Sequence, residues 1–180
     1  MTDERLALTP HEHVTVRASA PGALEVEAEY APHGSPPPPH LHPGQDERFE
    51  VLSGELRTKV DGRERTLRAG DSLEIPRGTA HQMWNGAGEP ARVRWVTSPA
   101  GRTLAWFREL DALQRSGRVG RNGLPGPLAF AVYLTEYRDV FRLAGPLPAP
   151  VQRGVFAALA PLGRLRGYEA RASEASPAGV

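Results

Sequence analysis

Hydrophobic and polar positions follow two different periods along this chain, and the change falls near residue 100. Over residues 24–30 apolar residues alternate with glutamates, and over residues 92–95 they alternate with arginines. A period of two predicts strands with one buried face and one solvated face. The first part of the chain is therefore predicted to be mainly β.

A tight hairpin is predicted where two alternating runs flank Asp61 and Gly62. Both central positions of a type I′ turn need positive φ, which Asp-Gly accommodates well. Several short strands with turn residues between them are typical of an antiparallel sandwich or barrel. We therefore expect one β-barrel over residues 1–100.

After residue 100 the apolar residues recur at a helical period. Residues 104–113 predict a helix that ends at Gly117. Further helices are predicted over residues 128–144, capped by Gly145, and over residues 150–165. We expect residues 101–170 to form a helical extension, and residues 171–180 to form a flexible tail.

Composition excludes several classes of protein. Hydrophobic residues make up 39% and charged residues 24%, which is typical of a globular chain. The net charge is +1 and basic residues are scattered among acidic ones, so we expect no nucleic-acid partner. Cysteine is absent, which favours a reducing compartment. With no apolar signal region and no run of membrane-spanning length, the sequence predicts a cytoplasmic protein without a membrane partner.

Four potential metal ligands, His40, His42, Glu47 and His81, occur at spacings that a small barrel can bring to one point. Residues i and i+2 of a strand point to the same side, so His40 and His42 should face one direction. Three imidazoles and one carboxylate suit a single divalent transition metal: Fe, Mn, Ni, Zn or Cu. The three other histidines lack spaced partners and are interpreted as structural or solvated.

Both ligand segments resemble the two motifs of the cupin superfamily. Residues 34–54 follow the pattern G-x5-HxH-x4-E-x6-G, and residues 70–85 follow G-x5-PxG-x2-H-x3-N. The 15 residues between the two segments are similar to the spacing in small single-domain cupins. The resemblance implies a double-stranded β-helix, or jelly-roll barrel, with the metal in its mouth. It also implies the ligand role of all four residues.

The pocket around the metal is expected to be mostly apolar. Strand parity points to five lining residues: Tyr30, Phe49, Val51, Met83 and Trp95. No lysine or arginine has clear inward parity, so we expect a small apolar or aromatic carbonyl or enol substrate rather than an anion.

A four-ligand metal in a barrel mouth keeps open coordination positions, which suits catalysis. The resemblance implies dioxygenases, oxalate-degrading enzymes, isomerases and lyases as precedents. We favour an Fe(II) dioxygenase-type oxidoreductase, in which Glu47 could also shuttle a proton. The alternatives are a non-catalytic cupin that binds or senses a small molecule, and a metal-dependent isomerase or lyase. We expect a homodimer, with the helices covering one barrel face or forming a dimer contact rather than closing the site.

Overall fold

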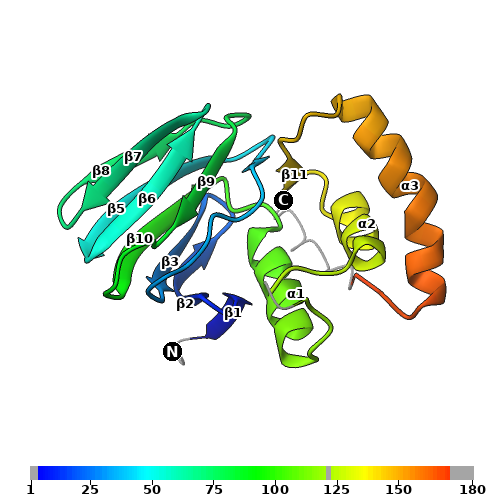
Figure 1. Cartoon of the computed structure of the whole chain (residues 1–180), viewed down its shortest axis with the longest axis horizontal. Helices are drawn as coiled ribbons and strands as arrows, with labels where there is room; N and C mark the ends of the chain where they lie inside the picture. Colours follow the sequence, from blue (N-terminus) through cyan, green and yellow to red (C-terminus); the bar gives the residue numbers. More distant parts are fainter. Residues whose placement is uncertain (1–3, 121–122, 171–180) are drawn as a thin grey trace.

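The alternation of apolar and polar residues produces two antiparallel sheets that face each other around a common core, as a computed structural model of the chain shows (Figure 1). The structure describes residues 4–120 and 123–170. The first sheet has the order β1 (Arg5–Thr9), β2 (Glu12–Ala20), β3 (Ala23–Tyr30), β10 (Ala91–Ser98), β5 (Asp46–Ser53) and β8 (Ser72–Ile75). The second has the order β11 (Arg142–Leu143), β4 (His40–Leu41), β9 (His81–Trp84), β6 (Glu55–Val60) and β7 (Arg63–Arg68).

Strand β3 follows its predicted alternation without a break. Leu24, Val26, Ala28 and Tyr30 are all buried, and the residues between them are partly exposed. β10 pairs with β3 so that Trp95 lies opposite Val26, which places apolar side chains of both strands on the inner face. The predicted double-sheet barrel is confirmed.

The hairpin between β6 and β7 turns at the predicted residues. Asp61 has φ +46° and Gly62 has φ +80°, and Val60 pairs with Arg63 across the turn. Positive φ at both positions is the conformation that a type I′ turn requires.

Three helices follow the barrel: α1 (Thr103–Arg115), α2 (Pro127–Glu136) and α3 (Ala149–Leu165). The first and third agree with the predicted ranges. The second prediction is wrong in its C-terminal half, because α2 ends at Glu136 and a short strand follows. That strand, β11, pairs with β4 of the barrel, and this tertiary pairing overrides local helix propensity. Gly145 therefore does not cap a helix.

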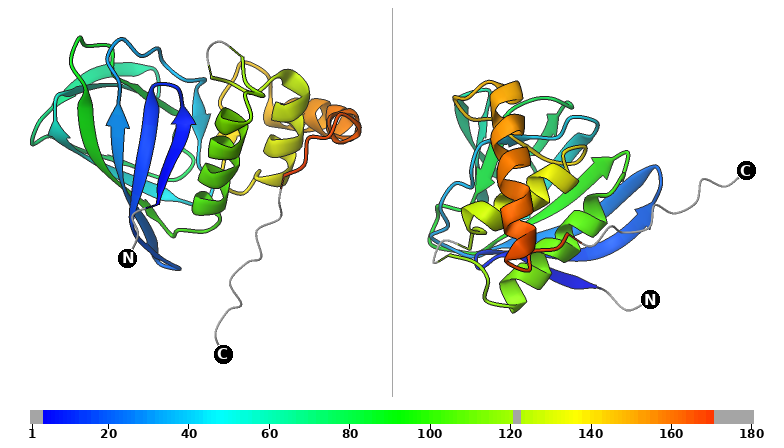
Figure 2. Two further views of the ribbon diagram at one scale, coloured as in Figure 1. Left: turned by 90° about the horizontal axis from the view of Figure 1, so that it is seen from below. Right: turned by 90° about the vertical axis from the view of Figure 1, so that its right-hand side faces the viewer.

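The helices are arranged in layers beside one end of the barrel (Figures 1 and 2). α1 packs against β1, whereas α3 packs on α2 and lies outermost. The predicted tail over residues 171–180 lies outside the described residues. No helix in the described ranges is long and apolar enough to cross a bilayer.

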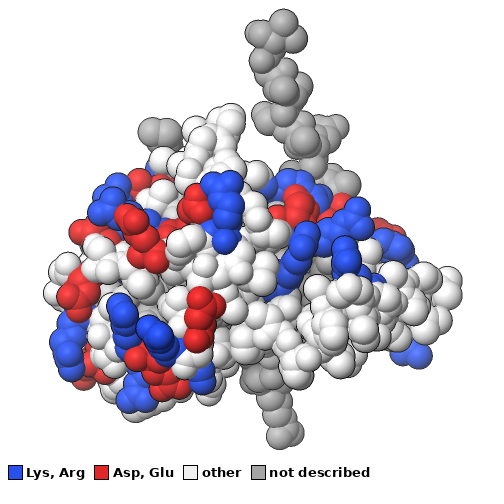
Figure 3. All heavy atoms as spheres, turned by 90° about the horizontal axis from the view of Figure 1, so that it is seen from above, with Lys and Arg blue, Asp and Glu red and all other residues white. Residues whose placement is uncertain are grey.

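The two parts of the molecule differ in their surfaces. Acidic and basic side chains intermix on the barrel, whereas the outer end of the helical region is mostly uncharged on the face drawn in Figure 3. Apart from Leu52 on β5, the large apolar side chains that remain exposed in the described ranges lie on α3 or just before it: Leu147, Val151, Val155, Leu162 and Leu165.

Candidate metal centre and its cavity

Three histidines converge where the barrel meets the helices. His40 lies on β4, His42 directly follows that strand, and His81 begins β9, where it pairs with His40. One ring nitrogen from each of the three lies within 4.8 Å of the others. The motif positions thus bring three of the four predicted ligands together.

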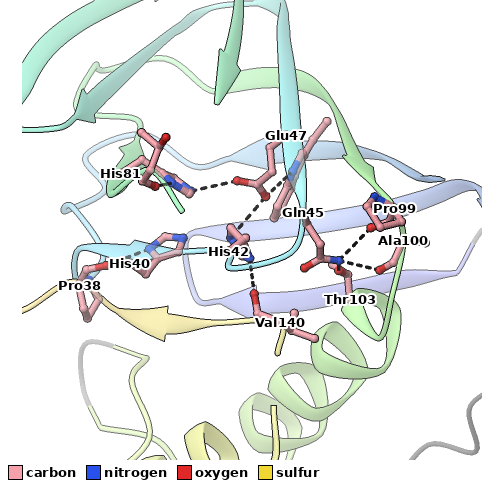
Figure 4. Close-up of polar contacts among 12 residues, drawn as sticks. Pro38, His40, His42, Gln45, Glu47, His81, Pro99, Ala100, Thr103 and Val140 are labelled. Atoms are coloured by element: carbon pink, nitrogen blue, oxygen red, sulfur yellow. Dashed lines mark hydrogen bonds and ion pairs between the residues drawn. The ribbon is translucent and has the colours of Figure 1, made fainter. Parts of the chain in front are cut away.

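Each imidazole is oriented by a main-chain carbonyl oxygen at its Nδ1 (Figure 4). His40 Nδ1 lies 3.0 Å from the oxygen of Pro38, and His81 Nδ1 lies 3.0 Å from the oxygen of Thr79. His42 Nδ1 lies 2.6 Å from the oxygen of Val140. Because a carbonyl oxygen only accepts hydrogen bonds, each Nδ1 must carry the proton. In the neutral form of each ring, Nε2 is then left with a lone pair, which is the form that binds a metal.

Glu47 lies beside this cluster and contacts two of its members. One carboxylate oxygen, Oε1, is 3.4 Å from His42 Nε2, and the other, Oε2, is 3.1 Å from His81 Nε2. The indole N–H of Trp95 donates to Oε1 at 3.0 Å. Glu47 is only 3% exposed, so its carboxylate is held by these neighbours rather than by water. The fourth predicted ligand is therefore adjacent to the three histidines but outside their tight group.

Burial and charge act in opposite directions on these residues. Burial, reinforced by the neighbouring imidazoles, lowers the pKa of His40 to about 3. Burial opposes the charged form of Glu47, but His42 and His81 outweigh it and lower the pKa of Glu47. Burial also opposes protonation of His81, but the adjoining Glu47 carboxylate raises the pKa of His81.

The donor atoms fit a divalent transition metal. His42 Nε2 and Glu47 Oε2 are buried and accept no hydrogen bond while the imidazoles are neutral. Unpaired buried polar atoms are costly, and a cation that both could coordinate would remove that cost. Three imidazoles with an adjacent carboxylate form the donor set that suits such a metal.

The histidines open onto a cavity of about 120 Å³. Tyr30, Phe49, Met83 and Trp95 line it, as strand parity predicts. Val51 does not line the cavity. It lies two residues further along β5, opposite Val93, and is 1% exposed in the barrel core. Strand parity predicted correctly that Val51 faces inward. It did not predict how far along β5 the cavity extends.

Much of the cavity wall comes from the helical extension, which sequence reasoning assigned to covering a barrel face or to a dimer contact. The helices and the segment after α2 supply Trp106, Phe107, Leu110, Phe130, Tyr133, Leu134 and Phe141. Phe141 stacks on His40, with ring centroids 4.6 Å apart. The extension therefore forms one side of the barrel mouth. Two adjacent aromatic residues, Trp106 and Phe107, were the signal in the sequence that could have indicated this role.

A polar contact beside the site joins the barrel to the first helix (Figure 4). The buried Gln45 amide donates to the carbonyl oxygens of Pro99 at 3.1 Å and Ala100 at 2.8 Å. It also lies 2.5 Å from the hydroxyl of Thr103, the first residue of α1. This bridge fixes where α1 begins relative to the ligand segment.

A double-sheet barrel with three inward-facing imidazoles at an apolar mouth defines a small β-barrel protein with a candidate metal site. Residues 26–97 match the family model described as "Cupin domain". The match spans 72 of the 180 residues, so this segment is similar to a cupin domain, and a helical extension follows it.

Sequence relatives share parts of this chain. The tetracenomycin polyketide synthase protein TcmJ of Streptomyces glaucescens is 35% identical over 90 residues, which cover 50% of this chain and 54% of that protein. The oxidoreductase iacF of Pestalotiopsis fici is 49% identical over 49 residues, which cover 27% of this chain and 24% of that protein. The chain thus spans about half or less of the length of these relatives.

Solved structures share the barrel. KdgF from Halomonas sp. superimposes with a TM-score of 0.51 at 22% identity, covering 56% of this chain and 92% of that one. An RmlC-like cupin from Shewanella frigidimarina gives a TM-score of 0.51 at 20% identity, covering 57% and 89%. These similarities establish the fold.

Proposed function

We propose that this protein is a metal-dependent oxidoreductase of the dioxygenase type, which acts on a small, largely apolar carbonyl, enol or aromatic compound. The observation that carries the proposal is the convergence of one ring nitrogen from each of three histidines on the wall of an aromatic cavity. A closed structural metal site would be surrounded by protein, whereas this one adjoins space for a second molecule.

His40, His42 and His81 would hold the metal, with Glu47 as an additional ligand. A bound divalent metal would supply Lewis-acid polarisation of a substrate oxygen and, as Fe(II), redox chemistry with O2. Fe(II) is slightly preferred because imidazole and carboxylate donors together suit it, while Mn, Ni, Zn and Cu also accept this set.

The walls of the cavity favour an apolar, planar substrate. Phe49 and Trp95 stack with ring centroids 5.3 Å apart, and the ring centroids of Trp95 and Phe107 lie 5.0 Å apart. A continuous aromatic surface therefore faces the histidines. Aromatic walls bind planar rings by offset or edge contacts and exclude water from the reacting atoms. None of the cavity-lining residues in the described ranges is a lysine or an arginine, which disfavours an anionic substrate.

The names of two relatives agree with this choice. One is called an oxidoreductase, and the other is a polyketide synthase protein. The matches cover only 24% and 54% of the two relatives, so they support the class of chemistry and leave the compound to experiment.

The test begins with untagged protein and its metal content by elemental analysis. O2 consumption is then followed with β-diketones, flavonols and catechols after loading with Fe(II). Turnover of at least one class, lost in His42→Ala, would support the proposal. A compound that co-purifies unchanged, with no turnover under any metal, would favour a binding or sensing cupin instead.

A further inference from the structure

A carboxyl group faces the cavity from β2, a strand that lies outside the two histidine-containing motifs. Glu12 begins β2 and lies opposite Tyr30 of β3 in the strand register. It shares its parity with Val14, which is fully buried, so Glu12 occupies an inward position where the strand otherwise carries apolar residues. The Tyr30 phenol is hydrogen-bonded to the Glu12 carboxyl group.

Glu12 and Tyr30 line the same cavity as the three histidines. The other titratable residue on the described part of its wall is Tyr133 of α2, which donates its hydroxyl to the carbonyl oxygen of Glu169. No lysine, arginine or aspartate lines the cavity within the described ranges. Glu12 is partly exposed by its accessible surface, but its carboxyl group faces an apolar wall on which no described residue offers a cation. A carboxyl group in such a position is costly in its charged form, so the position calls for a functional explanation.

The protonation of this pair suits acid–base chemistry near neutral pH. Burial raises the pKa of Glu12 to about 7; the nearby charge of Glu47 adds to the rise, while the Tyr30 hydrogen bond opposes it. Burial, together with the Glu12 charge, raises the pKa of Tyr30 well above its usual value, so the phenol stays a hydrogen-bond donor. A general base is most effective when its pKa lies near the working pH.

We propose that Glu12 is a catalytic acid–base residue that takes the proton of an enolic or phenolic O–H group of the bound compound, with Tyr30 as its positioning residue. The O–H bond breaks, its electron pair stays on the substrate oxygen, and the proton bonds to a Glu12 carboxylate oxygen. The proposal deepens the proposed function and rests on it.

This assignment narrows the substrate class. The compound should carry two oxygen functions on a largely apolar frame, one directed to the histidines and one, an acidic O–H, directed to Glu12. Hydroxylated aromatic compounds and enolised diketones meet this description. A hydrocarbon or a compound with a single carbonyl would leave the Glu12–Tyr30 pair without a partner in the bound state.

The first measurement is independent of turnover. The full chain, loaded with redox-inert Zn(II), is titrated from about pH 5 to about pH 9 and followed by infrared difference spectroscopy. The C=O band of a protonated carboxylic acid should disappear with a midpoint near 7 in the wild-type protein. The carboxylic acid band that titrates with this midpoint should be missing in Glu12→Gln. It should be present in the control Glu64→Gln, whose side chain is 63% exposed on β7.

The second measurement is binding of 3-hydroxyflavone to the same Zn(II)-loaded variants by isothermal titration calorimetry. Glu12→Gln should weaken binding about ten- to a hundredfold through loss of a charge-assisted hydrogen bond, whereas Glu64→Gln should bind like the wild type. Tyr30→Phe should keep the infrared titration but move its midpoint to higher pH, because the phenol's hydrogen bond holds the Glu12 pKa down.

Turnover then separates the two proposals. Where a compound is oxidised, Glu12→Gln should lower kcat about a hundredfold or more, with unchanged metal content, and remove the pH limb near 7. Turnover that keeps its rate and pH profile in Glu12→Gln would overturn the role of Glu12 and leave the proposed function intact. If no compound is oxidised, the infrared and binding results decide: Glu12-dependent flavonol binding supports the assignment, and binding indifferent to Glu12→Gln overturns it.

Discussion

His42 of the barrel and Val140 of the helical extension are joined by a 2.6 Å contact between Nδ1 and the carbonyl oxygen, across 98 positions of the chain. The next residue, Phe141, stacks on His40, and Leu143 pairs with His40 in the β11–β4 ladder. One short segment of the extension thus orients two of the three histidines. The extension contributes to the candidate metal centre as well as to the cavity wall.

Arg102 should matter for metal binding although it does not touch a histidine. It precedes α1 and holds the end of α2: its guanidinium donates to the carbonyl oxygen of Glu136 at 2.6 Å and pairs with Asp139 at 2.5 Å. Arg102→Ala should free the segment that carries Val140 and lower Zn(II) affinity about tenfold, as loss of an outer partner of a ligand commonly does. Competition with a chromophoric chelator measures the change.

The matched control for that variant is Arg94→Ala. Arg94 pairs with Glu25 at 2.8 Å on the outer barrel face and is half exposed, so its removal should leave Zn(II) affinity unchanged. Equal losses in both variants would mean that general destabilisation, rather than release of the Val140 segment, accounts for the effect.

His42→Ala should abolish metal binding while the barrel stays folded. The apolar rows of β3, β5 and β10 do not depend on His42, so the far-ultraviolet circular dichroism spectrum should be retained. Elemental analysis should find about one metal ion per wild-type chain and almost none in the variant. His11→Ala, at an exposed turn, serves as the control. A variant that unfolds outright would indicate a structural metal.

The barrel and the convergence of His40, His42 and His81 were predictable because the relevant signals are local. The two-residue spacing of His40 and His42 and the positive-φ turn at Gly62 are properties of short segments, and each is sufficient to direct a side chain or reverse a strand. The expected homodimer and the cytoplasmic location stay predictions.

The features that the sequence did not predict depend on contacts between segments that are far apart in the chain. Residues 140–144 have helical periodicity, but β11 pairs with β4 instead, and only the folded barrel supplies that partner. Glu12 lies between two histidines in a segment that resembles a solvated turn. Its inward parity with Val14 and Val16 was visible, but the cavity that gives the position meaning is completed by helices more than ninety residues away.

Metal affinity should fall in acid. His81 must lose its Nε2 proton to bind a metal, and the Glu47 carboxylate overcomes burial to raise its pKa above the ordinary 6.5. Below that pKa, competition should weaken Zn(II) binding about tenfold per pH unit. His40, with a pKa of about 3, stays neutral and adds nothing to this dependence. A constant dissociation constant between about pH 5 and about pH 8 would contradict the assignment of His81 as a ligand.

Gly54 should resist substitution for two reasons that can be separated. Its φ is +75°, and a Cβ there would lie 2.5 Å from the carbonyl oxygen of Pro90. Gly54→Ala should lower the free energy of unfolding by about 3 kcal/mol, from backbone strain and overpacking together. Gly62→Ala, at φ +80° with nothing within 4 Å, should lose only the strain part, about 1 kcal/mol. Urea denaturation measures both, and equal losses would exclude a packing role for the close approach to Pro90.

Glu12→Gln should stabilise the fold at high pH and not at low pH. In the unfolded chain Glu12 loses its proton near 4.5, whereas burial holds the folded pKa at about 7. Between these values the folded state binds more protons, so this residue lowers the free energy of unfolding of the wild type as pH rises from 4.5 to about 7. Glutamine does not titrate, so the variant does not lose free energy of unfolding in this way as the pH rises. The free energy of unfolding of the variant should therefore exceed that of the wild type by up to about 3 kcal/mol at about pH 8, with close to none of that gain at about pH 4.

Urea unfolding at both pH values, with Glu64→Gln as control, gives the comparison. A difference between variant and wild type that is the same at both would mean that Glu12 ionises in the folded protein as it does in water.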